Sequence, residues 1–395
     1  MGWTIRTATD EDIPAVVKAV FAAFGSHAAE SQIELNRGFL EVDRCFVAVD
    51  GEAVVGNAAA VSLELTVPGP ATVPTAGVTF VGVTPTHRRQ GIGAALMAQV
   101  ADDARRRGEP LAALLASEST IYRRFGYGVA VFSTEAEIER PYARLRRPAD
   151  VAGRVRILDN AEMAGVLPAT YDRYRRSQPG EVSRPQGWWA RRLADDPNFR
   201  GGRGERFAAV WEGDEGYVTY RVDQSWPGGL PGHTLTIEDL VAASPEVRAG
   251  LWEFCFGVDL VSVVRILNLA LDDPLRWMLV DPRRLRTKQV NDFLWVNLLD
   301  VEAALSARTY GSDEALVIDV AGAGRFRLTA GQCRRTDDLA DLGLEVADLA
   351  STYLGGVSFP TLARAGLVAE LSAGALATAD RLFTTAPGPA SCTNF

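Results

Sequence analysis

The segment Phe80–Val100, with the sequence FVGVTPTHRRQGIGAALMAQV, combines residue types that suit phosphate binding. An apolar, strand-like run leads through Thr84-Pro85 into a loop, and an amphipathic helix pattern follows. The loop contains, in order, Arg88, Arg89, Gln90, Gly91, Ile92, Gly93 and Ala94. Free N–H groups at a helix N-terminus attract anions, glycines let the backbone approach a ligand closely, and arginines add positive charge. The loop therefore predicts a site for a phosphate or pyrophosphate group.

Two familiar nucleotide-binding loops do not fit this segment. The dinucleotide loop has the pattern G-x-G-x-x-G early in its fold, whereas here the loop begins with arginine and follows a fourth strand-like run. The P-loop needs Gly-Lys-Ser/Thr, which the chain lacks. The pattern that remains is R-x-x-G-x-G after a strand. The alternative is a glycine-containing helix start with exposed arginines.

A second candidate for chemistry is Tyr122, in the segment Leu114–Gly128 with the sequence LLASESTIYRRFGYG. A buried strand is expected over Leu111–Ala116 and a short helix over Thr120–Phe125. A neutral tyrosine, whose reference pKa is about 10, can donate a proton to a leaving group. The alternative is a buried aromatic ring whose hydroxyl is satisfied within the core.

A general base is harder to find. Histidine is the commonest such base, but the chain has only His27, His87 and His233, and none is convincingly placed. The chain ends in Ser-Cys-Thr-Asn-Phe, residues 391–395, after a Pro/Gly hinge, and a frayed tail is the usual interpretation. Prenylation of Cys392 is disfavoured because the next two residues are not aliphatic and no polybasic segment precedes them. Cys392 also lacks a histidine partner for a role as nucleophile, and a small packing residue is the plain alternative.

Composition limits the classes of protein. A chain of 395 residues is too long for one compact core, so two or three domains are expected. Fifty acidic and 41 basic residues give a net charge of −9, which argues against general nucleic-acid binding. The N-terminus lacks a signal-peptide pattern, and no apolar run reaches membrane-spanning length. The four cysteines are scattered without metal-ligand spacing. We therefore expect reduced thiols, no bound metal, no membrane partner and a cytoplasmic location.

The hydrophobic patterns divide the chain into three parts. Residues 1–143 alternate strand and helix patterns, and a basic, proline-terminated connector follows them. Residues 144–287 begin again with a strand, and their strand–turn–helix run at His233–Gly257 repeats the order found at Gly77–Arg107. Residues 288–395 mix helices and strands in another order. A mixed α/β fold of three domains, two of them related by duplication, is expected.

With THRRQGIG and SESTIYRRFGYG in its first 130 residues, the chain resembles the Eis (enhanced intracellular survival) family of GCN5-related N-acetyltransferases, or GNATs. In architecture the resemblance covers the whole chain. It implies a catalytic GNAT fold in residues 1–143, a degenerate GNAT fold in 144–287, and a sterol-carrier-protein-like α/β domain in 288–395 that delivers the C-terminal carboxylate. It also implies acetyl-CoA as co-substrate, direct transfer to primary amines such as aminoglycosides, other polyamine-like acceptors or lysine-like amines, and a homohexamer built as a trimer of dimers.

The resemblance also assigns roles to residues. Tyr122 is expected to protonate the departing thiolate, and the C-terminal carboxylate of Phe395 is expected to accept the proton of the amine. An α-carboxyl has a reference pKa of about 3.3–3.7, so it is a weak base unless desolvation raises the pKa or the carboxylate mainly orients the amine. The expected contacts with acetyl-CoA are made by Val81, Gly82, Val83, Arg88, Arg89, Gln90, Gly91, Ile92, Gly93, Ala94, Ser117 and Glu118.

Two other functions compete with this interpretation. A protein that senses acyl-CoA without turnover would keep the loop at Arg88–Ala94 but would tolerate the loss of Tyr122 and Phe395. A lipid carrier would need an apolar tunnel in the third domain.

Two further segments bear on the site. In the second half, the corresponding stretch VAASPEVRAGLWEF contains Arg248 and Gly250 but lacks R-x-x-G-x-G, so we expect it not to bind coenzyme A. Near the N-terminus, Glu30 and Glu34 either face an amine-binding pocket or form a solvated helix face.

Overall fold

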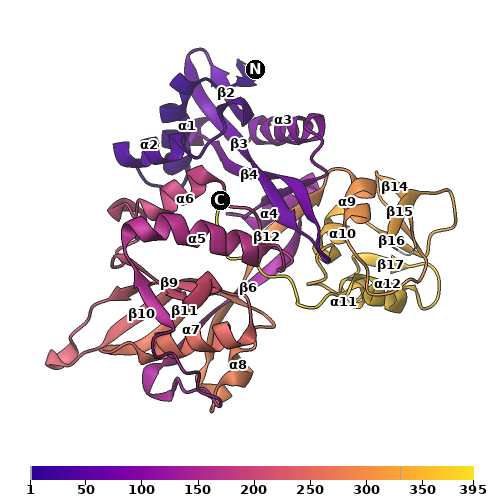
Figure 1. The fold of residues 1–395 in the computed structure, drawn as a ribbon. Coiled ribbons are helices and arrows are strands. Elements are labelled where there is room, and N and C mark those ends of the chain that lie inside the picture. Colours follow the sequence, from indigo (N-terminus) through magenta and orange to yellow (C-terminus); the bar gives the residue numbers. More distant parts are fainter. Residues whose placement is uncertain (1, 330) are drawn as a thin grey trace.

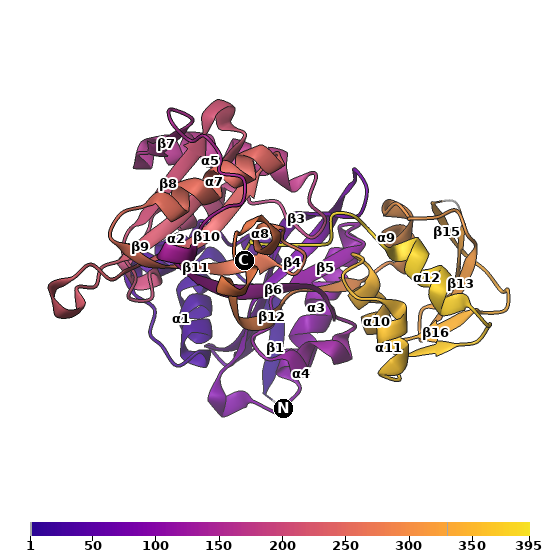
Figure 2. The ribbon, with the colours of Figure 1, turned by 90° about the horizontal axis from the view of Figure 1, so that it is seen from below.

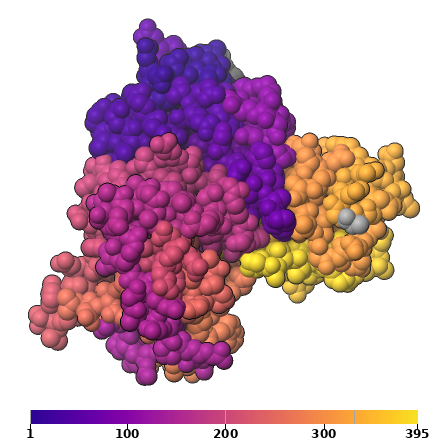
Figure 3. Space-filling view, viewed as in Figure 1, coloured from indigo at the N-terminus to yellow at the C-terminus, as the bar shows by residue number. Residues whose placement is uncertain are grey.

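The structure, a computed structural model, describes residues 2–329 and 331–395. The body of the molecule contains one sheet of 12 strands, and a smaller lobe contains a second sheet of five strands. Figure 1 shows the lobe, coloured orange to yellow, beside the body, and the space-filling view in Figure 3 shows it joined to the body along one side.

The large sheet has the strand order β1-β2-β3-β4-β5-β12-β6-β11-β10-β9-β8-β7. Its strands are β1 (Trp3–Thr7), β2 (Cys45–Asp50), β3 (Ala53–Thr66), β4 (Thr72–Val83), β5 (Leu111–Leu114), β6 (Gly128–Glu139), β7 (Val155–Leu158), β8 (Arg206–Trp211), β9 (Gly216–Asp223), β10 (His233–Ala242), β11 (Val261–Ala270) and β12 (Arg286–Leu298). The small sheet has the order β15-β14-β13-β16-β17, with β13 (Leu316–Val320), β14 (Gly324–Thr329), β15 (Gln332–Arg335), β16 (Leu342–Leu344) and β17 (Val368–Glu370).

The helices cover both faces of the large sheet and one side of the small sheet (Figure 1). They are α1 (Ile13–Ala23), α2 (Glu30–Arg37), α3 (Ile92–Arg106), α4 (Ser119–Tyr122), α5 (Asn160–Arg175), α6 (Gln186–Leu193), α7 (Pro245–Gly257), α8 (Leu275–Met278), α9 (Val301–Ala307), α10 (Val346–Thr352), α11 (Phe359–Arg364) and α12 (Ala375–Phe383).

Alternation along the central strands places α1 and α3 on opposite faces of the sheet. Val47 and Ala59 belong to the same buried cluster as the apolar side of α1, whereas their neighbours Phe46 and Ala58 belong to the cluster of α3. Successive side chains of a strand point to opposite faces, so strands buried on both sides carry nearly continuous apolar sequences. The site described below lies where β4 and α3 meet.

The two halves of the body are interlocked through their last strands. Strand β6 ends the first half, yet it lies between β12 and β11 of the second half; β12 in turn lies between β5 and β6. Both β12 pairings are antiparallel, with Trp295 opposite Leu114 on one side and opposite Val129 on the other. Residue 288, where we expected the third domain to begin, therefore lies within β12, and the separate lobe starts after Leu298.

The second half repeats the central unit of the first half. In both halves a strand, a helix and a parallel strand follow each other, as β4-α3-β5 and as β10-α7-β11. This repetition agrees with the duplication expected from the order of the patterns.

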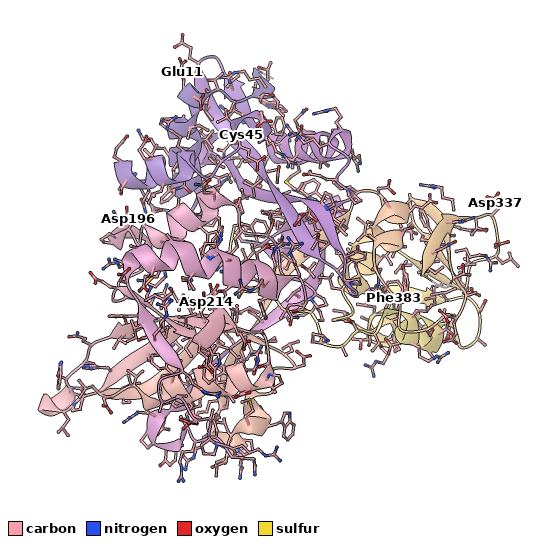
Figure 4. All side chains as sticks on the ribbon, viewed as in Figure 1. Glu11, Cys45, Asp196, Asp214, Asp337 and Phe383 are labelled. Atoms are coloured by element: carbon pink, nitrogen blue, oxygen red, sulfur yellow. The ribbon has the colours of Figure 1, made fainter. Side chains whose placement is uncertain are left out.

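The lobe has a filled interior. Phe326, Tyr353, Phe359 and Phe383 are each at most 2% exposed and pack together with Leu349. Figure 4 labels Phe383, the last residue of α12, in this lobe. From there the chain leaves the lobe, and Figures 1 and 2 both place its C-terminus within the body. None of the helices in the described residues combines the length and apolar character needed to cross a bilayer.

Candidate active site

A cavity of about 680 Å³ opens where β4 and β5 separate. The two strands pair only from Thr75 with Leu111 to Gly77 with Ala113. Strand β5 ends at Leu114, whereas β4 continues to Val83, so the last part of β4 has no partner on that side. An unpaired strand edge offers backbone donors and acceptors to an elongated ligand that carries amide groups.

Strand β4 bends as it reaches the cavity. Phe80 has a φ of 52°, and the pairing of β4 with β3 shifts register between Asn57 and Ala59. The Asn57 side-chain amide donates to the Phe80 carbonyl and holds this irregular backbone. Beyond the bend, Val81, Gly82 and Val83 line the cavity.

The N-terminus of α3 faces the same cavity. Gly91 precedes the helix with a φ of 86°, a left-handed conformation that favours glycine, and no side chain caps the helix. The amides of the first turn, from Ile92 to Ala94, are therefore available to an anion. A Cβ added at Gly93 would meet only the Val83 side chain, at an ordinary 3.8 Å. Since the fold does not require glycine at 93, the open space there suits the approach of a ligand.

Positive charge surrounds this end of the cavity. Arg88, Arg89 and Arg124 line it, and within the described residues none of the three forms an ion pair with a carboxylate. Arg88 donates to the Val83 carbonyl at 3.4 Å, and the Arg124 guanidinium lies 4.8 Å from the centre of the Phe125 ring. Gln90 is exposed and does not line the cavity.

Tyr122, on the short helix α4, lines the same cavity and is 6% exposed. Its ring packs edge-on against Tyr127, with centroids 6.2 Å apart. Burial raises the pKa of Tyr122, while a hydrogen bond with Ser117 acts in the opposite direction and nearby Glu118 raises it further. The hydroxyl therefore remains protonated at neutral pH and can act as a donor.

Two distant elements hold the segment of Tyr122, and neither is evident from the sequence. The Arg123 guanidinium pairs with both oxygens of Asp348 on α10, at 2.8 and 3.0 Å. The Asn297 side chain on β12 donates to the Phe125 carbonyl at 2.8 Å. More than 170 positions separate these partners along the chain, so no local sequence signal could reveal them.

The C-terminal tail does not line this cavity but enters the body through a series of contacts with the second half. Asp272 accepts from the Gly388 amide at 3.0 Å, and the Ala390 amide donates to the Pro179 carbonyl at 2.9 Å. The ring of Phe395 packs against the main core of the body. The tail is thus a bound segment and not a frayed end.

Three side chains from residues 181–188 hold the last residues of the tail. The buried Glu181 carboxylate accepts from the Cys392 amide at 3.2 Å, and Arg184 donates to the Thr393 hydroxyl at 2.9 Å. The Trp188 indole donates to the Asn394 carbonyl at 2.6 Å. Burial raises the pKa of Glu181, although the nearby Arg184 charge lowers it. The only local sign of this clamp in the sequence is an unusual pair of tryptophans at the start of α6.

The histidines and the acidic residues of α2 take no part in the cavity's reactive region. His27 is exposed and outside the cavity lining, and His233 is buried against the Ser225 backbone. His87 lines the end of the cavity near Arg88, and its Nε2 lies 3.3 Å from Oδ2 of Asp50. Glu30 and Glu34 are exposed and outside the lining, which fits a solvated helix face.

The corresponding gap in the second half is closed. It holds only about 20 Å³ and is filled by side chains that include Trp252 and Leu269. Helix α7 is capped by the Ser244 side chain and begins with a proline, and Arg248 is paired with Asp273 at 2.9 Å. These features leave no anion site there.

Comparison with known proteins agrees with this geometry. Residues 4–130 and residues 180–298 each match a family described as an acetyltransferase (GNAT) domain, and residues 301–391 match a sterol carrier protein domain. The N-acetyltransferase Eis of Mycobacterium tuberculosis is 34% identical over 377 residues, which cover 92% of either chain. The chain belongs to the Eis family of N-acetyltransferases. Another relative, named an N-acetyltransferase, from Streptomyces avermitilis is 39% identical over 400 residues, 98% of either chain.

A solved member of the Eis family has the same fold. The crystal structure of Eis1 from Mycobacterium abscessus is 37% identical and superposes with a TM-score of 0.90, covering 99% of this chain and all of that one. The expected fold class, two GNAT domains followed by a sterol-carrier-protein-like domain, is confirmed, and the chain is an acetyltransferase. GNAT enzymes take acetyl-CoA as co-substrate. The described residues contain no cluster of histidine, cysteine and acidic side chains suited to hold a metal ion.

Proposed function

We propose that this Eis family member transfers the acetyl group of acetyl-CoA directly to a primary amine, with Tyr122 as proton donor and the α-carboxylate of Phe395 as proton acceptor. The observation that carries the proposal is the meeting, in one cavity, of an unpaired β4 edge, an uncapped α3 N-terminus and a buried tyrosine. Aminoglycosides and other polyamine-like molecules are proposed acceptors, as the family resemblance implies.

In this proposal the α3 end of the cavity binds the pyrophosphate of acetyl-CoA. The first amides of α3 and the unpaired Arg88 and Arg89 supply donors and positive charge. The edge at Val81–Val83 bonds the amides of the pantetheine arm, and Ser117 and Glu118 line the other side. The thioester then lies next to Tyr122.

The reaction needs two proton transfers. The amine nitrogen attacks the acetyl carbonyl carbon, a C–N bond forms, and the C–S bond breaks. The proton lost by the nitrogen passes to the Phe395 carboxylate, directly or through water, and the Tyr122 hydroxyl gives its proton to the sulfur. The raised pKa of Tyr122 keeps that proton in place until negative charge develops on the thiolate.

The clamped tail supports the role given to Phe395. The hydrogen bond from Trp188 to the Asn394 carbonyl fixes the last peptide group of the chain, and the Phe395 ring packs on the core. Within the described residues, the terminal carboxylate forms no ion pair. A held, unpaired carboxylate suits either proton transfer or orientation of the amine.

Two further properties are proposed from the family resemblance. They are assembly into a homohexamer, arranged as a trimer of dimers, and a cytoplasmic location. If light scattering in solution gives the mass of a single chain, the proposed assembly is wrong.

The competing functions receive less support. A lipid carrier needs a tunnel in the lobe, but Phe326, Phe359 and Phe383 fill its interior. A sensor without turnover would not need the buried Tyr122 beside the expected thioester.

The test is release of coenzyme A from acetyl-CoA with an aminoglycoside or an aliphatic diamine as acceptor. The native chain should release coenzyme A, and Tyr122→Phe should release it far more slowly while still binding acetyl-CoA. Binding of acetyl-CoA without turnover on any amine would favour the sensor.

A further inference from the structure

A second cavity lies on the other side of the tail, in the second half of the body. It measures about 280 Å³ and opens between α6, the loop that follows α6, the strands β8 to β10 and the tail. Figure 4 labels Asp196, one of its lining residues, beside α2 and α6. Nothing in the proposed acetyl transfer uses this cavity.

The cavity has an excess of positive charge. Three carboxylates line it, Asp195, Asp196 and Glu238, together with five arginines: Arg191, Arg192, Arg203, Arg206 and Arg221. Four of these arginines share Glu238: Arg206 and Arg221 each approach it at 2.9 Å, Arg192 at 3.3 Å and Arg203 at 4.0 Å. Asp195 likewise forms an ion pair with Arg221, at 2.6 Å.

Arg191 is the cation that remains without a carboxylate. Its guanidinium donates to the Asn36 side chain at 3.1 Å and lies 4.2 Å from the centre of the Phe39 ring, and it forms no ion pair within the described residues. Burial and the neighbouring Arg192 lower the pKa of Arg191 to about 10. A largely desolvated cation beside a second cation is costly unless an anion compensates it.

The tail forms one wall of this cavity. Cys392 and Asn394 line it, and Thr393 between them is fully buried. The cavity is therefore one residue away from the terminal carboxylate.

We propose that this arginine-lined cavity is an oxyanion-binding site, which takes a carboxylate or phosphate group next to the tail. Arg191 supplies a cation without a carboxylate partner, and Arg192 shares Glu238 with three other arginines. Planar guanidinium groups match the geometry of both oxyanions. The group comes either from a free anion or from the amine acceptor itself. The second source rests on the proposed acetyl transfer and would favour acceptors that carry a carboxylate near the amine.

The first experiment measures binding without turnover. Thermal unfolding is followed with increasing inorganic phosphate while coenzyme A is saturating, so that the first cavity is already filled. Native protein should gain several degrees in Tm, since a ligand that binds only the folded state stabilises it. Arg191→Met keeps the contact with Phe39, and Arg192→Gln leaves Glu238 with its two closer arginines. Both variants should lose most of this gain. Arg265→Met, an exposed substitution outside the cavity with the same change in charge, should keep it.

The second experiment separates the two sources of the anion. Lysine and cadaverine are compared as acceptors, because they differ only by the α-carboxylate. If the acceptor supplies the anion, the native enzyme should prefer lysine by tenfold or more in kcat/KM, and Arg191→Met should abolish the preference. A phosphate effect without a preference for lysine assigns the site to free anions. If neither the phosphate effect nor the preference depends on Arg191 or Arg192, the proposal is wrong. If the enzyme is inactive on every amine, the proposed acetyl transfer is wrong, but the phosphate experiment still tests the oxyanion site.

Discussion

The Trp188 indole nitrogen donates a hydrogen bond of 2.6 Å to the backbone carbonyl of Asn394, the last peptide group before the C-terminus. This contact joins α6 of the second GNAT domain to a tail that emerges from the third domain. Since the tail is also held by Glu181 and Arg184, the degenerate GNAT domain holds the three residues that precede Phe395. The second and third domains thus together position the end of the chain.

Removal of the Tyr122 hydroxyl should slow the reaction without loosening the fold. General acid catalysis contributes about 10²–10⁴-fold, so Tyr122→Phe should lower kcat by at least about 100-fold. The Kd for acetyl-CoA should stay the same. Tyr127→Phe is the matched control, because Tyr127 packs edge-on against Tyr122 but does not line the cavity. Equal losses in the two variants would indicate a packing effect.

The alkaline pH dependence should follow the pKa of Tyr122. Burial raises this pKa above its ordinary value of 10, and ionisation destroys the acid form. We therefore expect kcat to remain level up to about pH 10, the reference value of tyrosine. Rate measurements from pH 7 to pH 10 check this. A fall in kcat centred well below pH 10 that Tyr122→Phe abolishes would contradict the raised pKa.

Gly93→Ala should weaken the binding of acetyl-CoA without destabilising the fold. Alanine is favoured over glycine in helices by up to about 1 kcal/mol, and the new Cβ meets only Val83 at 3.8 Å. The Tm should therefore hold or rise. The KM for acetyl-CoA should rise about tenfold or more, equivalent to about 1.4 kcal/mol, because the Cβ intrudes on the phosphate site. An unchanged KM would mean that no ligand approaches residue 93 closely.

The contact between Arg123 and Asp348 should matter for catalysis more than for binding. Asp348 is 2% exposed and holds the residue next to Tyr122. Asp348→Asn should lower kcat roughly tenfold, about 1.4 kcal/mol in the barrier, with little change in the Kd for acetyl-CoA. The control is Glu345→Gln, since Glu345 is 66% exposed and lies 3.4 Å from Arg123. Steady-state kinetics on both variants should show a clear difference.

Glu238 should make the stability of the second domain sensitive to acid. Its arginine neighbours, set against burial, lower its pKa from 4.5 to about 2. Because the folded pKa lies below the unfolded one, the carboxylate stabilises the fold above pH 4.5, and this contribution is lost as the pH falls toward 2. The effect is about 3 kcal/mol at most. Urea unfolding of the native chain and of Glu238→Gln should show a smaller pH dependence between pH 5 and pH 3 in the variant.

The parts of the site that are local in sequence could be predicted. The loop from Arg88 to Gly93 and its helix depend on neighbouring residues, because the strand, the glycines and the apolar face of α3 all lie within some 25 positions. The resemblance to the GNAT family implies Tyr122, because a tyrosine on the short helix after this strand matches the family's proton donor. The structure brings both segments to one cavity.

The parts that depend on distant contacts could not be predicted. Strand β12 has an ordinary mixed sequence, and its place between β5 and β6 is set by the exchange of strands between the two halves. The clamp of the tail by Glu181, Arg184 and Trp188 joins residues about 200 positions apart. A sequence pattern describes the preferences of each segment but not the partner that a segment meets.

The proposed role of the Phe395 carboxylate is tested by comparing the native chain with a chain extended by one glycine after Phe395. The extension moves the terminal carboxylate away from its place and leaves the acetyl-CoA cavity intact. Coenzyme A release with an amine acceptor should fall by about 100-fold or more, the scale of a lost general base, while the Kd for acetyl-CoA stays unchanged. Equal turnover by the two chains would contradict the role of the Phe395 carboxylate and would make His27 the next base to test.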